Sequence, residues 1–289
     1  MDKFRNDNQG IVLPRAFIFS LRILEFFHPY LSMRLATFFF SKPFRYKIQD
    51  REIPILSQAQ ISFFNIKKLG KTICCYHWKG KGPKIMLVHG WSGRASNFYK
   101  IVEELKGLNF DVYAFDAPAH GKSKGVTTNL SEFIVCLETL LNRWGTFDTI
   151  LGHSGGGFSC TYICARHPEI KLLVLISPFD RITDLFKKYY EMIRLGKKAQ
   201  NLMYNYFFRK MKKDISEFST SISAQSIISK TLIIHDENDR EVELYNSINI
   251  NKNLQKGKLF VTKGLGHRRI LRTDIVIDKI VSFLGPINL

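Results

Sequence analysis

The chain has 289 residues, 45% of them hydrophobic, which is enough for one large α/β domain with a substantial buried core. Its five cysteines are an odd number without disulfide-framework or zinc-site spacing, so we expect a reducing, cytoplasmic compartment and no metal site. The net charge of +18 favours anionic partners in general, but no recognised nucleic-acid motif accompanies it, and we expect no nucleic-acid partner.

The N-terminal segment from Ile11 to Phe40 is rich in Phe, Leu and Ile. Charged residues and a proline interrupt it, at Arg15, Arg22, Glu25, Pro29 and Arg34. The apolar runs are therefore too short for a membrane-spanning helix, and no small-residue cleavage site marks a signal peptide. We predict that residues 1–60 form a helical arm packed on the main domain. Its basic and apolar faces leave a peripheral membrane anchor as the alternative.

From about Phe63 onward, short apolar runs alternate with segments of helical periodicity. Strands are predicted at 63–68, 72–78, 84–89, 110–115, 149–152, 172–177, 230–235 and 258–262. Helices are predicted at 95–106, 129–143, 156–167, 242–253 and 270–284. This alternation predicts an α/β domain over residues 61–289, with a mostly parallel central sheet and helices on both of its faces.

The alternation breaks for about fifty residues after Ser177, and we predict a short helical lid at about residues 180–228 over the carboxyl edge of the sheet. Between Arg181 and Lys213 there are ten Lys or Arg residues against two acidic residues, a net of +8. Seven Phe or Tyr residues are interleaved with them. A solvated basic face is the simpler interpretation, and contact with an anionic membrane is the alternative.

The residues Gly152-His153-Ser154-Gly155-Gly156 lie between a predicted strand and a predicted helix. The spacing G-x-S-x-G is typical of a nucleophile elbow, in which a strained turn exposes the serine hydroxyl and small neighbours prevent clashes. A glycine-rich turn that binds an anion at the helix N-terminus is the alternative. The strand–turn–helix context favours the elbow, with Ser154 as the nucleophile.

A serine nucleophile needs a base and an acid that orients the base. His267 lies in a glycine-bearing loop between the last predicted strand and the last helix, and Asp239 follows the strand before it. The order Ser, Asp, His matches one of the known arrangements of a catalytic triad, and the 85 residues between Ser154 and Asp239 leave room for the lid. We therefore predict that Ser154, Asp239 and His267 are the catalytic residues.

These motifs resemble the α/β-hydrolase fold family over roughly Phe63 to Leu289. His89-Gly90-Trp91 is similar to the H-G-x oxyanion loop of that family. The resemblance implies that the backbone N–H groups of Trp91 and Gly155 form the oxyanion hole. Such donors typically contribute about 3 kcal/mol each to transition-state stabilisation.

Two motifs depart from the family pattern. The segment from Asp116 to Ser123 resembles D-x-x-G-H-G-x-S, but Ala119 stands where glycine is usual, and we interpret the segment as structural support. The segment from His235 to Val242 resembles H-G-x-x-D-x-x-V, with Asp236 in place of the glycine. Asp236 is therefore a second candidate for the acid. Asp180 is a third, because some family members carry the acid one strand earlier.

The predicted function is hydrolysis of a carboxylic ester, or a related acyl bond, through an acyl-enzyme intermediate and without a cofactor. The partner is then a small-molecule acyl substrate. Dehalogenases and many epoxide hydrolases on this fold use an aspartate nucleophile, and a serine at the elbow argues against both. Thioester cleavage, acyl transfer and C–C bond hydrolysis on the same triad remain alternatives, as does a non-enzymatic binding protein on the hydrolase fold. The oligomeric state is left open.

Overall fold

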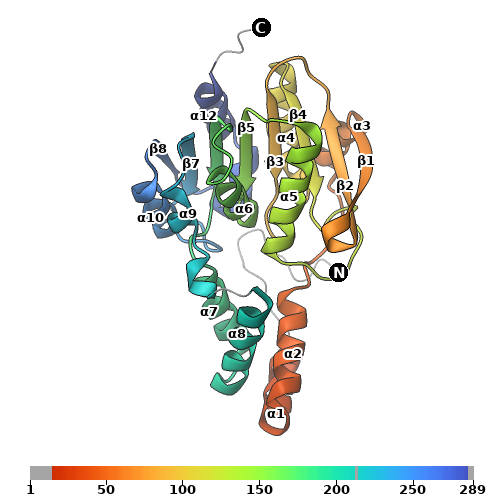
Figure 1. Cartoon of the computed structure of the whole chain (residues 1–289), viewed down its shortest axis with the longest axis vertical. Coiled ribbons are helices and arrows are strands. Elements are labelled where there is room, and N and C mark those ends of the chain that lie inside the picture. Colours follow the sequence, from red (N-terminus) through yellow and green to blue (C-terminus); the bar gives the residue numbers. More distant parts are fainter. Residues whose placement is uncertain (1–14, 212–213, 286–289) are drawn as a thin grey trace.

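The computed structural model describes residues 15–211 and 214–285. The first 14 residues of the predicted arm, together with Lys212 and Lys213 of the basic segment, lie outside the described residues. The strands are β1 (Gln60–Ile66), β2 (Lys71–Trp78), β3 (Lys84–Val88), β4 (Asp111–Asp116), β5 (Thr149–His153), β6 (Leu172–Ile176), β7 (Lys230–Asp236) and β8 (Gly257–Thr262). They form one sheet in the order β1-β2-β4-β3-β5-β6-β7-β8 (Figure 1).

Within this sheet, β2 pairs antiparallel with β1 and β4, and every other neighbouring pair is parallel. The carboxyl ends of β3 to β8 therefore meet at one edge of the sheet, where open α/β sheets bind their ligands. The α-helices are α1 (Arg15–Phe27), α2 (Pro29–Phe40), α3 (Ile53–Ser57), α4 (Tyr99–Gly107), α5 (Leu130–Trp144), α6 (Gly155–Cys164), α7 (Ile182–Ile193), α8 (Lys197–Met211), α9 (Thr220–Ala224), α10 (Tyr245–Asn253), α11 (Gly266–Arg269) and α12 (Asp274–Leu284).

The central strands are continuous apolar runs because both faces of the sheet are covered, as strand β3 shows. Met86 and Val88 point into a core shared with α5, α6, α9 and α10, whereas Ile85 and Leu87 point into a core shared with α3, α4 and α12. Successive side chains of a strand face opposite sides of the sheet, so a strand covered on both faces is apolar at every position. The predicted α/β architecture, with helices on both faces, is confirmed.

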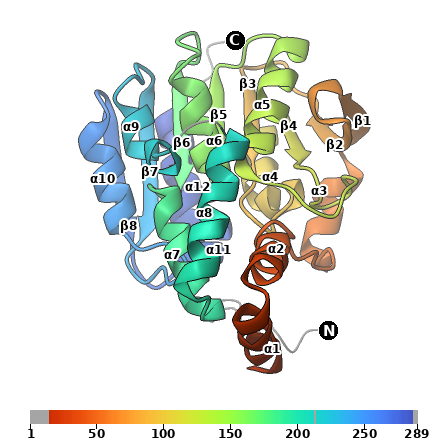
Figure 2. The same cartoon turned by 60° about the horizontal axis from the view of Figure 1, so that its bottom comes forward.

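A third apolar cluster joins the N-terminal helices to the segment after β6. We call α1 and α2 (residues 15–40) the arm, and α7, α8 and their connection (residues 182–211) the lid. Phe40 of the arm stacks on Phe186 of the lid with ring centroids 4.8 Å apart, and Tyr189 donates a hydrogen bond to the Ala36 carbonyl (2.7 Å). Arm and lid lie side by side, below the carboxyl edge of the sheet (Figures 1 and 2).

The arm does not extend as a helix to residue 60. After Phe40 the chain is irregular, and α3 packs on the sheet through Ile55, which is buried in the same core as Trp78. Glu52, just before α3, is buried and accepts hydrogen bonds from the Arg94 guanidinium (2.9 Å). Residues 50–57 thus pack on the main domain through the buried side chains of Glu52 and Ile55. The predicted domain boundary near residue 60 stays a prediction.

Across residues 15–211 and 214–285, no helix combines the length and the apolar character needed to cross a bilayer.

Candidate active site

Ser154 lies in a strained turn between β5 and α6. Its φ of 51° and ψ of −118° place a non-glycine residue in a region that L-residues rarely adopt. The glycines around it permit this turn. A Cβ on Gly156 would lie 2.0 Å from the Val88 carbonyl oxygen, and one on Gly152 would lie 2.6 Å from the Gly156 carbonyl oxygen. The helix therefore approaches the sheet closely enough to present the partly exposed Ser154 at the carboxyl edge.

The loop after β3 lies directly against this turn. A Cβ on Gly90 would lie 2.9 Å from Cβ of Ser154, and one on Gly155 would lie 3.7 Å from the backbone nitrogen of Trp91. The N–H of Gly155 belongs to the first turn of α6, where backbone donors have no partner within the helix. The structure thus brings the two predicted oxyanion-hole donors, Trp91 and Gly155, next to each other and next to Ser154.

His267 and Asp239 are hydrogen-bonded to each other. Nδ1 of His267 lies 2.6 Å from Oδ2 of Asp239, and both side chains are buried. Because a carboxylate only accepts hydrogen bonds, Nδ1 carries the proton and Nε2 of His267 is left as a proton acceptor. The described residues include no hydrogen bond between the His267 ring and the Ser154 hydroxyl. Such contacts are often long without substrate and shorten in the substrate complex.

The remaining partners of Asp239 fix its orientation. Its other oxygen, Oδ1, accepts hydrogen bonds from the backbone N–H groups of Glu241 and Val242, each at 2.9 Å. Burial opposes ionisation of Asp239, but the hydrogen bond and charge of His267, with the Val242 N–H, lower its pKa to about 2. Burial also opposes the charged form of His267, which by itself would lower the pKa of this residue. The hydrogen bond to ionised Asp239 outweighs burial and raises the pKa of His267 above its ordinary value.

Asp236 has a different role from Asp239. Its carboxylate accepts hydrogen bonds from the backbone N–H groups of Leu265 and Gly266 (both 2.9 Å) and from the Thr262 hydroxyl (2.8 Å). These bonds join the end of β7 to the loop that carries His267. Burial raises the pKa of Asp236, but the hydrogen bonds outweigh it and the pKa is lowered. The second candidate acid therefore holds the histidine loop rather than the histidine ring.

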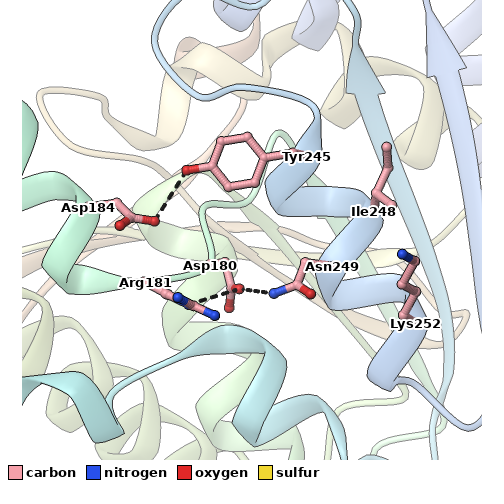
Figure 3. Close-up of a pocket in the computed structure, with 7 residues that line it drawn as sticks. All are labelled: Asp180, Arg181, Asp184, Tyr245, Ile248, Asn249 and Lys252. Atoms are coloured by element: carbon pink, nitrogen blue, oxygen red, sulfur yellow. Dashed lines mark hydrogen bonds and ion pairs between the residues drawn. The ribbon is translucent and has the colours of Figure 1, made fainter.

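Asp180 lies at the base of the lid. It accepts hydrogen bonds from the Ser219 hydroxyl (2.6 Å) and the Ser221 N–H (2.8 Å), where the chain returns from the lid. It also lines a cavity of about 350 Å³ that the triad residues do not line (Figure 3). The other residues around this cavity are Arg181, Asp184, Tyr245, Ile248, Asn249 and Lys252. The third candidate acid is thus occupied by contacts with the segment that follows the lid, and this cavity is separate from the Ser154 turn.

The segment from Asp116 to Ser123 supports the loop after β3. The Asp116 carboxylate accepts hydrogen bonds from the N–H groups of Ala95 and Lys122, each at 2.8 Å. A Cβ on Gly121 would collide with this carboxylate. Ala119, in the place of the usual glycine, has a φ of 65°, so it carries the strain that glycine would avoid.

Two histidines next to the triad were not identified from the sequence. The ring Nε2 of His153 lies 2.9 Å from the His267 carbonyl oxygen, and burial and the nearby His267 lower the pKa of His153 to about 3. His235 lies 3.5 Å from Oδ2 of Asp239, and burial lowers its pKa. The signals were present in the sequence, since His153 precedes the elbow serine and His235 begins the motif of the acid.

No cluster of three or more His, Cys, Asp or Glu side chains suited to a metal ion occurs in the part of the chain that the structure describes.

Comparison with known proteins agrees with this fold. The family model of the alpha/beta hydrolase fold matches residues 83–210, a segment that contains Ser154 but ends before Asp239 and His267. An esterase structure from Pyrococcus furiosus has a TM-score of 0.64 and 18% sequence identity, over 85% of this chain and 99% of the esterase. The chain has the α/β-hydrolase fold, as the sequence motifs predicted.

Curated relatives match a shorter segment. Monoglyceride lipase of Mus musculus is 32% identical over 121 residues, which cover 38% of this chain and 40% of the lipase. The pimeloyl-acyl-carrier-protein methyl ester esterase of Chromobacterium violaceum is 29% identical over 103 residues, which cover 35% of this chain and 39% of the esterase. The matched part of the chain thus spans about two-fifths of the length of these relatives.

Proposed function

We propose that the protein is a serine hydrolase that cleaves carboxylic ester bonds of small acyl substrates through an acyl-enzyme intermediate. The observation that carries the proposal is the 2.6 Å hydrogen bond between His267 and Asp239, at the sheet edge where Ser154 occupies the strained turn. The names of the relatives, a monoglyceride lipase and a methyl ester esterase, support an ester as the substrate class.

In the proposed mechanism, Oγ of Ser154 attacks the acyl carbon and passes its proton to Nε2 of His267. The N–H groups of Trp91 and Gly155 stabilise the tetrahedral oxyanion. When this intermediate collapses, His267 gives the proton to the departing alcohol, and the acyl group stays on Ser154. Water then attacks the acyl-enzyme, His267 accepts the proton of the water, and release of the carboxylic acid returns that proton to Ser154.

Asp239 serves this cycle by holding His267 in the tautomer that leaves Nε2 free. It also stabilises the imidazolium that forms in both tetrahedral steps. The depressed pKa of Asp239 keeps its carboxylate ionised throughout the neutral range. Asp236, His153 and His235 position the loops around the triad and, in our proposal, exchange no proton with the substrate.

Apolar residues next to the elbow support an apolar acyl group. Phe158, in the first turn of α6, stacks on Phe179 with ring centroids 5.2 Å apart, and both belong to the apolar cluster shared with the lid. A Cβ on Gly155 would lie 3.0 Å from the Leu130 side chain. An acyl chain that enters between lid and sheet would therefore meet mainly hydrocarbon and aromatic surface.

Hydrolysis of p-nitrophenyl esters and acyl thioesters of graded chain length tests the proposal. We expect ester hydrolysis by the full-length protein and its loss in Ser154→Ala. Turnover of thioesters well above that of esters would move the assignment to a thioesterase with the same triad. Absence of turnover on the whole series, or equal turnover in Ser154→Ala, would contradict the proposed function.

A further inference from the structure

The arm carries apolar side chains that no other part of the described chain covers. Phe19, Ile23, Phe26 and Phe27 recur at the spacing of one helical face of α1. Phe26 is 83% exposed, and the rings of Phe26 and Phe27 contact each other edge to face at 5.1 Å. Tyr30 and Leu31, in the first turn of α2, are also more than half exposed. We call these six residues the aromatic face.

The aromatic face is part of a folded structure and not of a loose tail. On the other side of the arm, Leu21 and Met33 are buried in the cluster shared with the lid. The Glu25 carboxylate accepts a hydrogen bond from the Gly196 N–H (2.8 Å), directly before α8. A Cβ on Gly196 would collide with that carboxylate, so the Glu25 side chain links α1 to the start of α8. The aromatic side chains are therefore held outward by a packed helix.

Basic residues surround the aromatic face. Arg22 and Arg34 of the arm are exposed, and so are Lys197 and Lys198, in the first turn of α8 beside Glu25. The described residues offer none of these four side chains an ion-pair partner. Glu25 is the single acidic residue between positions 15 and 48, and backbone N–H groups of the lid already bind its carboxylate. The lid adds seven Lys or Arg residues against Asp184 and Glu191, so the net charge of arm and lid together is positive.

We propose that the aromatic face, with its basic surroundings, docks the protein on a lipid bilayer that contains anionic headgroups. Aromatic side chains are favoured at the boundary between headgroups and acyl chains, and Lys and Arg are attracted to an anionic leaflet. A second copy of the chain fits this surface poorly. A symmetric contact would bring the same basic residues together between two molecules that each carry +18.

The position of the surface gives docking a consequence for the site. Arm and lid lie side by side below the carboxyl edge of the sheet, and α1 is at the far end (Figure 2). A bilayer in contact with α1 would thus lie on the same side of the molecule as the lid and Ser154. If the proposed function holds, acyl lipids can reach the site from the membrane surface. The docking itself does not depend on catalysis.

Vesicle co-sedimentation of the full-length protein tests the proposal, with phosphatidylcholine vesicles that contain either no or about 30% phosphatidylglycerol. We expect binding to the anionic vesicles and a steep loss between about 20 mM and about 150 mM salt. Phe26→Ser combined with Phe27→Ser, and Lys197→Glu combined with Lys198→Glu, should each weaken binding at least about tenfold.

Matched controls change the same residue types elsewhere. Phe63→Ser alters a Phe of β1 that is 59% exposed, and Lys256→Glu combined with Lys258→Glu reverses two exposed lysines at the amino end of β8. We expect these variants to bind within about twofold of the unchanged protein. If the control variants weakened vesicle binding as much as the arm and lid variants, net charge or overall apolarity would account for binding. That result would overturn the proposal.

Two further outcomes would also overturn it. One is absence of binding to anionic vesicles at low salt. The other is a dimer, detected by sedimentation velocity, that Phe26→Ser with Phe27→Ser dissociates, because the aromatic face would then bind a second copy. Turnover of a water-soluble ester, measured in the same variants, separates the two proposals. A variant that loses vesicle binding but keeps its turnover shows that the substituted residues act in docking and not in catalysis. Absence of turnover in every protein, the unchanged one included, would contradict the proposed function and leave the docking proposal unaffected.

Discussion

The triad loops and the arm–lid unit both lie at the carboxyl edge of the sheet, but different interactions stabilise them. At the triad, buried carboxylates bind backbone N–H groups: Asp236 fixes the His267 loop, and Asp239 fixes the ring of His267. In the arm–lid unit, stacked rings such as Phe40 on Phe186 dominate, and polar contacts are few. Hydrogen bonds define direction, whereas apolar contacts do not. The first region is thus suited to chemistry and the second to adaptable surfaces.

The largest loss of activity is expected at Asp239, whose hydrogen bond orients His267 in the proposed mechanism. Asp239→Asn should lower kcat on p-nitrophenyl esters by about 10⁴-fold, because an amide can stabilise the wrong tautomer of His267 and carries no charge. Asp180→Asn is the matched control. Its carboxylate binds Ser219 and Ser221, where the chain returns from the lid, and we expect less than about tenfold loss. If Asp180→Asn proved the more damaging change, the acid would have to be reassigned.

The pH profile of the same proteins gives a second measurement of this prediction. His267 must be neutral to accept the Ser154 proton, so kcat/KM should fall as pH drops through the pKa of His267, which Asp239 raises. The residual activity of Asp239→Asn should retain its acidic limb at a lower pH, because the variant loses the Asp239 carboxylate, the main group that opposes the effect of burial on the pKa of His267. An acidic limb at unchanged pH would separate Asp239 from the titrating group.

The next effect concerns the close approach of α6 to the sheet. Gly156→Ala would place a Cβ 2.0 Å from the Val88 carbonyl oxygen. We expect a loss in the free energy of unfolding of about 3 kcal/mol, near the upper end for overpacking, because backbone must move. Gly107→Ala, in α4 with no atom within 4 Å of the added Cβ, should be neutral or stabilising by up to about 1 kcal/mol. Urea unfolding measures both, and equal values would show that the elbow tolerates a wider separation.

A smaller loss of stability is expected from a substitution in the arm–lid unit. Glu25→Ala removes the acceptor for N–H groups at the start of α8 and should cost about 1 kcal/mol, as loss of a helix cap does. Hydrogen exchange should accelerate in α1 and in the first turn of α8 but not around Ser154. Glu191→Ala, on the exposed surface of α7, is the control. A loss of soluble-ester turnover as large as that in Asp239→Asn would show that the two regions are not independent.

The smallest effect concerns Ala119, where the chain departs from the family pattern. The left-handed conformation costs a non-glycine residue about 1–2 kcal/mol, and glycine recovers this at an entropic cost of about 0.5–1 kcal/mol. Ala119→Gly should therefore stabilise the protein by about 0.5–1 kcal/mol in thermal unfolding. Asn109→Gly, at a φ of 65°, should change little, because asparagine tolerates this conformation. Destabilisation by Ala119→Gly would contradict the strain at this position.

The arrangement of the site was predictable from local patterns. Ser154, Asp239 and His267 each follow a strand in the sequence, and parallel strands bring their carboxyl ends to one edge. The choice of acid was not predictable in the same way. Asp236 is the last residue of β7, whereas Asp180 and Asp239 follow β6 and β7, so their positions alone do not separate them. The motif resemblance ranked Asp239 first, and the tertiary hydrogen bonds show what each carboxylate contacts. Asp236 accepts hydrogen bonds from N–H groups of the loop that carries His267. Asp180 accepts a hydrogen bond from the Ser221 N–H, where the chain returns from the lid.

The arm–lid contacts were beyond prediction from the sequence for another reason. The composition of residues 15–40 favours a packed arm and leaves a membrane anchor as the alternative, and the structure shows that the arm has one buried apolar side and one exposed apolar side. Met33 is buried against the lid while Phe26 is exposed on the other side. Which apolar residues of such a helix become buried depends on a partner that is distant in the sequence, here α7 and α8, so periodicity alone does not determine it.

Labelling with a fluorophosphonate probe tests whether Ser154 is an activated nucleophile, and it requires no knowledge of the substrate. The Ser154 oxygen would displace fluoride from phosphorus while His267 takes the proton, as in the proposed acylation step. Digestion and mass spectrometry should locate one adduct, on Ser154, that is absent from Ser154→Ala and strongly reduced in His267→Ala. An adduct on another serine, or none on the folded full-length protein, would contradict the assignment of Ser154 as the nucleophile.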